Sequence, residues 1–182
     1  GVGKELLARL VHEQSGRAGE PFVPANMAAI PGDLFESVLF GHVRGAFTGA
    51  AGDAAGLAEA VGKGTLFLDE IGDLPPALQG KLLRFLDTGE YLPLGGRTAR
   101  RSAGRIVAAT NRDLGQLVAE GLFRADLYHR LDVFGFRVPP LRERRGDIVP
   151  IARWTLEEAA GRCDFGELEL GEGARAVIER YD

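Results

Sequence analysis

The residues best suited to chemistry are two adjacent acids, Asp69 and Glu70, which follow the apolar run Thr65-Leu66-Phe67-Leu68. A short, uninterrupted apolar run is typical of a strand that is covered on both faces in a parallel sheet. Acids at the carboxyl end of such a strand face the crevice where open α/β sheets bind ligands. Asp69 could then hold Mg²⁺ while Glu70 polarises an attacking water molecule. A solvated acidic turn that caps the next helix is the alternative.

A second candidate for chemistry stands at the start of the chain, where Gly1-Val2-Gly3-Lys4-Glu5 precedes apolar residues at helical spacing. It resembles the last part of a P-loop, in which backbone N–H groups and a helix N-terminus hold phosphates while the lysine reaches the β and γ oxygens. Glu5 replaces the Ser or Thr that usually helps to hold Mg²⁺, so the metal would depend more on Asp69 and water.

Two further stretches carry candidate residues. Asn111 follows the apolar run Arg105-Ile106-Val107-Ala108-Ala109-Thr110, where its amide could orient water, although an isolated Asn is more often a turn former. Gly45-Ala46-Phe47-Thr48-Gly49-Ala50 places one aromatic ring and one hydroxyl between glycines that free the backbone. This hexapeptide is either a loop tip that touches a partner or an ordinary surface turn.

The elements that must position these residues alternate between strands and helices. We expect a strand over Phe22–Asn26, a helix through residues 33–39, and a helix from Pro75-Pro76 with Leu78, Leu82, Leu83, Phe85 and Leu86 on its buried face. This order predicts an α/β fold with a mostly parallel, helix-covered sheet. Pro139-Pro140 end the pattern, and only helices are expected over residues 147–160 and 173–181. We therefore predict a nucleotide-binding subdomain over residues 1–140 and a partial helical lid over residues 141–182.

Composition excludes several classes of protein. The 182 residues carry a net charge of −4, so this segment is not expected to hold DNA by its overall field. The single cysteine, Cys163, excludes an internal disulfide, and the three histidines show no metal-ligand spacing. No apolar run is long enough to cross a bilayer and no leader is visible, so we expect no membrane contact and a cytoplasmic location.

Five motifs, taken together and in order, resemble the AAA+ central domain of sigma-54-dependent transcriptional activators, the bacterial enhancer-binding proteins. The resemblance covers nearly the whole chain. It implies a AAA+ P-loop NTPase with ATP and Mg²⁺ as cofactors, assembled as a homo-oligomeric ring, a hexamer, that remodels the sigma-54 RNA polymerase closed complex. Promoter or enhancer DNA would be bound through domains absent from this chain. The motifs are Gly1-Val2-Gly3-Lys4-Glu5, Gly45-Ala46-Phe47-Thr48-Gly49-Ala50, Gly64-Thr65-Leu66-Phe67-Leu68-Asp69-Glu70-Ile71, Ala108-Ala109-Thr110-Asn111-Arg112-Asp113-Leu114 and Pro140-Leu141-Arg142-Glu143-Arg144-Arg145.

The resemblance also implies residue roles near the site and in the loops. Phe47 and Thr48 would form the tip of a loop that engages sigma-54, and Leu94-Gly95-Gly96-Arg97 would lie in a second, cooperating loop. Asn26 would donate a hydrogen bond to the catalytic Glu70 and so couple the nucleotide state to the position of the loop.

Two arginines are similar to the arginine fingers that reach the γ-phosphate of a neighbouring subunit. They are Arg124 and Arg130, in the stretch from Phe123 to Leu131. Their alternative role is that of a solvated basic helix face. Because a finger supplied in trans can be worth about 10³ to 10⁵ in rate, hydrolysis would depend on assembly.

The chain departs from the family pattern at Met27, where a Cys is common, and at Gly56-Leu57, where an Arg-Phe pair is usual. It also stops at Tyr181-Asp182, before the family's sensor II arginine, and opens inside the phosphate loop. We therefore expect both ends to be artificial and these residues alone to hydrolyse ATP poorly. Two rivals are a regulator acting on another form of polymerase, which would lack Phe47-Thr48, and a nucleotide-binding module without hydrolysis, which would lack Glu70.

Overall fold

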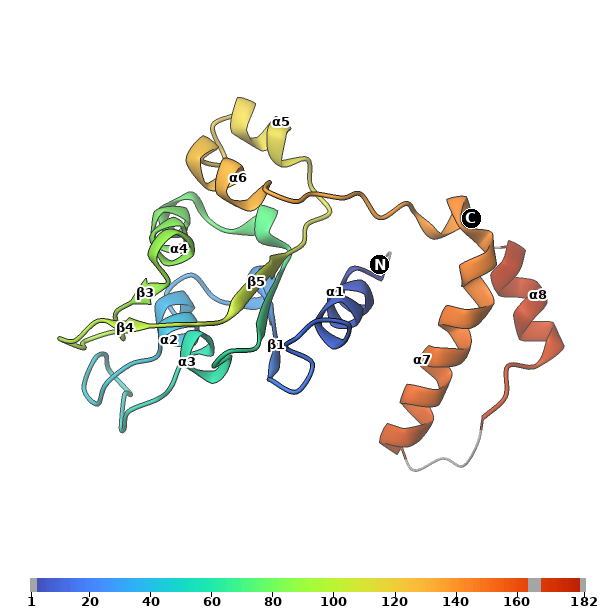
Figure 1. Cartoon of the computed structure of the whole chain (residues 1–182), viewed down its shortest axis with the longest axis horizontal. Coiled ribbons are helices and arrows are strands. Elements are labelled where there is room, and N and C mark those ends of the chain that lie inside the picture. Colours follow the sequence, from blue (N-terminus) through green and yellow to red (C-terminus); the bar gives the residue numbers. More distant parts are fainter. Residues whose placement is uncertain (1–2, 164–167, 181–182) are drawn as a thin grey trace. The chain divides into compact units, whose positions relative to one another are not determined.

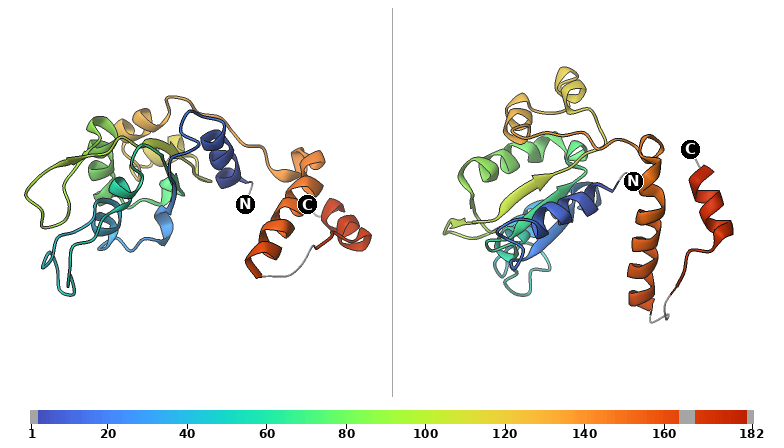
Figure 2. Two further views of the ribbon diagram at one scale, coloured as in Figure 1. Left: turned by 60° about the horizontal axis from the view of Figure 1, so that its bottom comes forward. Right: turned by 45° about the vertical axis from the view of Figure 1, so that its right-hand side comes forward.

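The computed structural model describes residues 3–163 and 168–180. The described chain forms two compact units, and the first runs from Gly3 to Gly135 (Figures 1 and 2). The division therefore falls before Pro139-Pro140, whereas the predicted boundary falls after them. Residues 135–140 contain no helix or strand, so the stretch that leads into the prolines belongs with the second unit rather than with the sheet.

A parallel sheet of three strands forms the centre of the first unit, in the order β1 (Phe22–Asn26), β2 (Thr65–Asp69) and β5 (Arg105–Ala108). The register places Asn26 opposite Asp69 and Leu66 opposite Ile106. Because β2 has a strand on each edge, its first four residues are buried and only Asp69 is partly exposed. This central strand confirms the predicted parallel sheet.

The third strand differs from the expectation of a strand covered on both faces. Three of its residues are partly exposed and Ala108 is exposed. In the described residues β5 pairs with β2 alone and forms an edge of the sheet. An apolar run predicts that a strand tends to be buried. How far it is buried depends on the strands and helices that pack against it, and the run itself does not specify these.

Helices cover the sheet, and in Figure 1 α1 lies on the opposite side of it from α2 and α4. Pro76 occupies the first turn of α4, where its missing N–H costs nothing. The helix ends at Gly89, whose φ of 70° closes the last turn with a hydrogen bond to Phe85 O. Leu78, Leu82 and Phe85 face the core as predicted. The helices of this unit are α1 (Lys4–Glu13), α2 (Phe35–Phe40), α3 (Leu57–Ala60), α4 (Pro76–Thr88), α5 (Leu114–Ala119) and α6 (Ala125–Leu131).

Shorter elements complete the first unit. The 3-10 turns η1 (Met27–Ala29) and η2 (Ile71–Asp73) follow β1 and β2, and an antiparallel ribbon joins β3 (Glu90–Tyr91) to β4 (Arg100–Arg101). The ribbon carries the predicted second loop at its tip.

The second unit is helical, as predicted. It contains the 3-10 turns η3 (Leu141–Glu143) and η4 (Arg145–Asp147), followed by α7 (Ile148–Cys163) and α8 (Glu172–Arg180), which lie side by side (Figure 1). Tyr181, the predicted last residue of α8, lies outside the described residues. In the described part of the chain, no helix combines the length and apolar character that a membrane span requires.

Candidate functional site

Asp69 and Glu70 lie at the carboxyl end of β2, at the edge of the sheet where the sequence places them. Glu70 adopts a left-handed conformation with a φ of 53°, and among the described residues it is the only non-glycine residue with a positive φ. Its backbone N–H donates to Asp69 Oδ1 at 3.0 Å. A non-glycine residue in this conformation costs on the order of 1 kcal/mol, and such strain gathers at functional sites.

Lys4 reaches this acid pair from the first turn of α1. Its Nζ lies 3.2 Å from Glu70 Oε1 and 3.9 Å from Asp69 Oδ1. The loop can enter the helix here because Gly3 has a φ of 81°. All three side chains are largely shielded, with exposed fractions of 17%, 25% and 21% for Lys4, Asp69 and Glu70. The fold thus joins two predicted motifs that are 66 residues apart.

The other residues of the phosphate loop contribute less in this structure. Glu5 is paired with Arg9 at 3.1 Å on the exposed surface of α1, and it makes no described contact with Asp69 or Glu70. Gly1 and Val2 lie outside the described residues. Their phosphate-binding role stays a prediction.

Asn111 contributes to the site through its backbone. Its N–H donates to Glu70 Oε2 at 3.2 Å, while its side chain is exposed. Next to it, the Ile71 N–H donates to Ala109 O at 3.0 Å, which ties the turn after β2 to the end of β5. Each Glu70 carboxylate oxygen therefore has a donor, one from Lys4 and one from Asn111.

Asn26 lies beside Asp69 in the sheet register. Its side-chain oxygen accepts a hydrogen bond from Ala28 N–H at 3.0 Å and caps the turn η1. In the described chain it makes no hydrogen bond to Glu70, and its one side-chain bond is the cap that its oxygen accepts from Ala28 N–H. Asn26 is thus near the acid pair, and its coupling to Glu70 stays a prediction.

The chemistry of the acid pair fits a magnesium ion that is held largely by a nucleotide. Asp69 and Glu70 offer the carboxylate oxygens that Mg²⁺ prefers. No group of three potential metal ligands occurs among the described residues. Mg²⁺ commonly takes one or two carboxylates and draws its other ligands from phosphates and water, so a small protein donor set is what such a site requires.

Arg124 is the N-cap residue of α6, and Arg130 lies in the last turn of that helix. Neither guanidinium group has a described hydrogen bond to Asp69 or Glu70. Arg124 holds Asp126 through two hydrogen bonds, Nε to Oδ1 at 3.0 Å and Nη2 to Oδ2 at 2.7 Å. These bonds lower the pKa of Asp126 and raise that of Arg124. Arg130 binds Leu86 O at 2.9 Å and Asp87 Oδ1 at 3.1 Å. Both guanidinium groups are about half exposed, so each is accessible from outside the chain.

The Gly45–Ala50 hexapeptide forms a small closed loop. Gly45 N–H donates to Ala50 O at 2.9 Å, and Ala50 N–H donates to Phe47 O at 3.0 Å. Gly45 and Gly49 have φ values of 79° and 106°, a conformation that glycine adopts readily and that explains why glycine occupies both positions. Phe47 is 38% exposed, and its ring meets the His42 ring in a T-shaped arrangement at a centroid distance of 5.0 Å.

The second loop lies against the base of the first. Val43 N–H donates to Leu94 O at 3.1 Å, and Leu94 N–H donates to Gly41 O at 2.8 Å. Gly95 is so close to Ala46 that an added Cβ would come within 2.9 Å of the Ala46 Cβ. The structure therefore brings together the two loops that the sequence analysis pairs.

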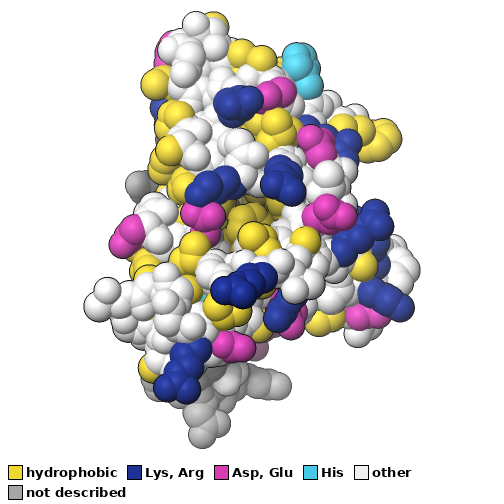
Figure 3. Space-filling model, turned by 90° about the vertical axis from the view of Figure 1, so that its left-hand side faces the viewer, with side chains coloured by type: hydrophobic (Ala, Val, Ile, Leu, Met, Phe, Trp, Pro, Cys, Tyr) yellow, Lys and Arg dark blue, Asp and Glu magenta, His cyan; other side chains and the backbone are white. Residues whose placement is uncertain are grey.

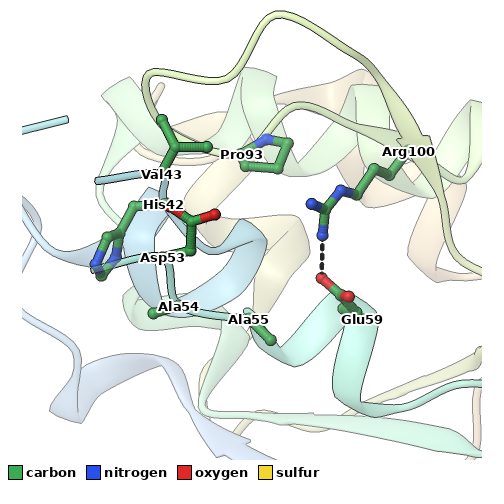
Figure 4. A pocket seen from close by; sticks show the side chains of 8 residues that line it. All are labelled: His42, Val43, Asp53, Ala54, Ala55, Glu59, Pro93 and Arg100. Atoms are coloured by element: carbon green, nitrogen blue, oxygen red, sulfur yellow. Dashed lines mark hydrogen bonds and ion pairs between the residues drawn. The ribbon is translucent and has the colours of Figure 1, made fainter. Parts of the chain in front are cut away.

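A pocket of about 190 Å³ lies at the base of these loops (Figure 4). An ion pair between Glu59 of α3 and Arg100 of β4 forms one wall, with His42, Asp53 and Pro93 around it. On the face of the molecule seen in Figure 3, basic and acidic side chains are interspersed. That face therefore presents no continuous basic surface for DNA.

Comparison with known proteins places the chain in a family. Residues 1–137 match the family model described as the sigma-54 interaction domain. The chain belongs to the sigma-54 interaction domain family. It is 51% identical, over 181 residues, to the nitric oxide reductase transcription regulator NorR2 of Cupriavidus necator, and 56% identical, over 159 residues, to the transcriptional regulator NtrC of Rhizobium meliloti. These matches cover 100% and 87% of this chain but only 35% and 33% of the relatives.

Solved structures agree with this assignment. Structures of NtrX from Brucella abortus in complex with ADP and with ATP match with TM-scores of 0.81 and 0.79 at 36% identity. They cover 100% and 99% of this chain and 39% and 40% of NtrX. An Hsp104 structure, 18% identical with a TM-score of 0.59 over 87% of this chain and 31% of that chain, shares the fold. The sigma-54 interaction domain described here therefore has the predicted AAA+ P-loop ATPase fold.

Sequence reasoning missed three side chains of this sigma-54 interaction domain that connect its parts. Glu59 and Arg100 join α3 to the ribbon, and neither belongs to a motif. Gln79 is fully buried on α4 and bonds three backbone groups. A signal for Gln79 was present, because it is a polar residue beside Leu78 on a helix face that was predicted to be apolar.

Proposed function

We propose that this sigma-54 interaction domain is the ATP-hydrolysing motor of a bacterial transcriptional activator, and that it remodels the sigma-54 RNA polymerase closed complex. The observation that carries the proposal is the placement of Lys4 Nζ 3.2 Å from Glu70 Oε1 and 3.9 Å from Asp69 Oδ1, at the carboxyl end of the central strand. The binding of ADP and ATP by NtrX, and the names of NorR2 and NtrC as transcription regulators, support it.

The geometry supports distinct roles for the three side chains. Lys4 would bind β- and γ-phosphate oxygens, and a phosphate would compete with Glu70 for its ammonium group. Glu70 would then be free to accept a proton from the attacking water. Asp69 would hold Mg²⁺, which supplies charge neutralisation at the phosphates when it is bound. The Asn111 N–H, which already holds Glu70 Oε2, would keep the carboxylate oriented.

Hydrolysis would require a homo-oligomeric ring, a hexamer, because Arg124 and Arg130 are assigned to the site of a neighbouring subunit. In this chain both guanidinium groups bind exposed acids, Asp126 and Asp87, which a γ-phosphate could replace at little cost. The gain from a finger would then appear only on assembly.

Nucleotide state would control the Phe47 loop as a two-state element. With a γ-phosphate present, Glu70 and Asn26 would adopt one arrangement, and hydrolysis would release it. Phe47 and Thr48 would present the loop tip to sigma-54, with the Leu94–Arg97 loop cooperating. Enhancer DNA would be bound by domains outside this chain, and the protein would act in the cytoplasm.

The test is ATP turnover per subunit, measured in the full-length protein over a range of concentrations. A ring enzyme should show turnover per subunit that rises steeply and then reaches a plateau, with the midpoint at the assembly concentration seen by light scattering. Nucleotide binding without turnover at any concentration would instead support the non-hydrolysing module. A regulator that acts on another polymerase form is disfavoured by the presence of Phe47 and Thr48.

A further inference from the structure

Gln79 is a polar side chain that lies wholly inside the first unit. It belongs to α4 and has an exposed fraction of 0%, and Leu78 and Leu82 of the same helix are also buried. Its amide makes three hydrogen bonds, and all three go to backbone groups. Nε2 donates to Leu74 O at 2.9 Å and to Leu122 O at 3.0 Å, and Oε1 accepts from Arg124 N–H at 2.8 Å.

One of these bonds ends on the turn that carries Glu70. Within that turn the Asp73 N–H donates to Glu70 O at 3.0 Å, and the Leu74 N–H donates to Ile71 O at 3.2 Å. Leu74 is therefore the far end of a short hydrogen-bonded segment that begins at Glu70. A displacement of Glu70 would also move Leu74 O, because these hydrogen bonds connect the two residues within one short turn.

The same turn is held from its other side by the segment after β5. Arg112 Nη1 donates to Gly72 O at 3.3 Å and lies 3.2 Å from Asp73 Oδ1. Gly72 approaches this segment so closely that a Cβ would lie 2.7 Å from Thr110 Oγ1. The turn is thus held on one side by the segment after β5 and on the other by Gln79, whose side chain also bonds the N-cap residue of α6.

The other bonds of Gln79 end at the start of α6. Arg124 is the N-cap residue of this helix, and no side-chain cap is formed by Arg124 itself. Its N–H donates to Gln79 Oε1, and the neighbouring Phe123 and Leu127 are buried in the core. The position of the Arg124 backbone is consequently set by α4, whereas its guanidinium group remains half exposed.

We infer that Gln79 is a positioning residue for hydrolysis, which fixes the backbone of Arg124 relative to the Glu70 turn. This inference rests on the proposed function, specifically on Arg124 serving a neighbouring site. The Gln79 amide bonds both the Glu70 turn, at Leu74 O, and the Arg124 N–H. The position of Arg124 therefore depends on the conformation of that turn. A displacement of about 1 Å in such a group can cost on the order of 10²-fold in rate.

The experiment uses the full-length protein with Gln79→Met, which keeps the side-chain length and removes all three hydrogen bonds. We expect turnover per subunit above the assembly concentration to fall roughly 10- to 100-fold, with ATP affinity in dilute protein unchanged. Gln79→Glu keeps an acceptor for the Arg124 N–H but sets a carboxylate oxygen against Leu74 O and Leu122 O in the core, so it should lose at least as much turnover as Gln79→Met. Gln116→Met is the matched control, because Gln116 is exposed and its side chain donates to the exposed Glu120 on the same helix surface.

Two further measurements separate positioning from general support of the fold. Mixing Gln79→Met with Glu70→Gln should restore turnover, since a Gln79→Met site can receive the intact Arg124 of a Glu70→Gln subunit. In an Arg124→Ala background, Gln79→Met should cost little more. Failure of the rescue would overturn the inference, and so would a full, additive loss of turnover from Gln79→Met in the Arg124→Ala background.

The outcome for Arg124→Ala alone distinguishes the two levels of the proposal. If Arg124→Ala keeps full turnover, the assignment of the finger fails, and the inference about Gln79 fails with it. If Arg124→Ala loses turnover and is rescued in mixtures while Gln79→Met is not, the proposed function stands and the role of Gln79 is refuted.

Discussion

The acid pair and the Gly45–Ala50 loop are held in opposite ways. Glu70 follows a buried strand, and its carboxylate receives hydrogen bonds from Lys4 and from Asn111 N–H. The loop is closed by its own backbone hydrogen bonds, and the Phe47 ring makes a T-shaped contact with His42. The acid pair is therefore held by hydrogen bonds to distant parts of the chain, whereas the loop is held mainly by hydrogen bonds between its own residues.

This difference matches the demands of the two proposed tasks. Proton transfer needs groups held at hydrogen-bond distance, which the sheet edge supplies. A contact loop must change position at low cost, and the segments of a fold with few buried contacts are those that open most readily. If the comparison is correct, changes at the acid pair should affect ATP turnover strongly and changes in the loop should not.

The largest expected effect on turnover is that of Glu70→Gln. The amide keeps the shape of the side chain but cannot accept the proton of the water, so turnover should fall roughly 10²- to 10⁴-fold while ATP binding is retained. Steady-state hydrolysis and equilibrium nucleotide binding measure the two properties. Glu13→Gln is the matched control, because Glu13 is exposed at the end of α1 and belongs to no predicted motif. Unchanged turnover would remove Glu70 from the role of base.

Loss of either proposed finger should have the next largest effect. Because Arg124 and Arg130 would share the γ-phosphate, we expect each single Ala variant to lose on the order of 10²-fold, less than the full value of a finger. Nucleotide affinity in the dilute monomer should not change. Arg84→Ala, on the exposed surface of α4, is the control.

Mixed rings test whether these arginines act in trans. A ring of Arg124→Ala and Glu70→Gln subunits contains sites that have both an intact base and an intact finger, so partial recovery is expected. The same holds for Arg130→Ala. Absence of recovery at every mixing ratio would show that the arginines serve folding or binding within their own subunit.

Phe47→Ala should change turnover by less than about twofold, since truncating an exposed side chain seldom disturbs a distant site. Sigma-54 binding and promoter opening should nevertheless be lost. Both are measured with the full-length protein and polymerase, and Val11→Ala, a truncation at a comparably exposed position on α1, is the control. Normal promoter opening by Phe47→Ala would show that the loop does not transmit ATP hydrolysis to sigma-54.

Much of the site was predictable because its signals are local. The apolar run before Asp69 reports a buried strand, and parallel strands bring their carboxyl ends to one edge, which places Glu70 near Asn111. The approach of Lys4 follows from its position at the start of a helix after a glycine-rich turn. The parallel sheet and the face of α4 were predictable for the same reason.

The parts that were not predictable depend on partners chosen by the fold. The Asn26 side chain could bond either Glu70 or the turn that follows β1, and in the structure its oxygen accepts a hydrogen bond from Ala28 N–H in that turn. The burial of β5 depends on what pairs with its second edge. Gln79 bonds Leu122 and Arg124, which are 43 and 45 residues away, so no local pattern specifies those bonds.

The smallest expected effect concerns the backbone of the loop itself. Gly49 has a φ of 106° and no atom within 4 Å of an added Cβ, so Gly49→Ala introduces backbone strain without a clash. A rigid loop would lose about 1 to 3 kcal/mol in the free energy of unfolding. A loop that is free to relax would lose much less. Gly52→Ala, which has open space and no positive φ, is the matched control for urea denaturation of the full-length protein. We expect Gly49→Ala to cost less than about 1 kcal/mol and to leave turnover unchanged, because the loop is held mainly by its own hydrogen bonds. A cost near the upper value would show that the loop is as firmly fixed as the acid pair, and the contrast between the two regions would fail.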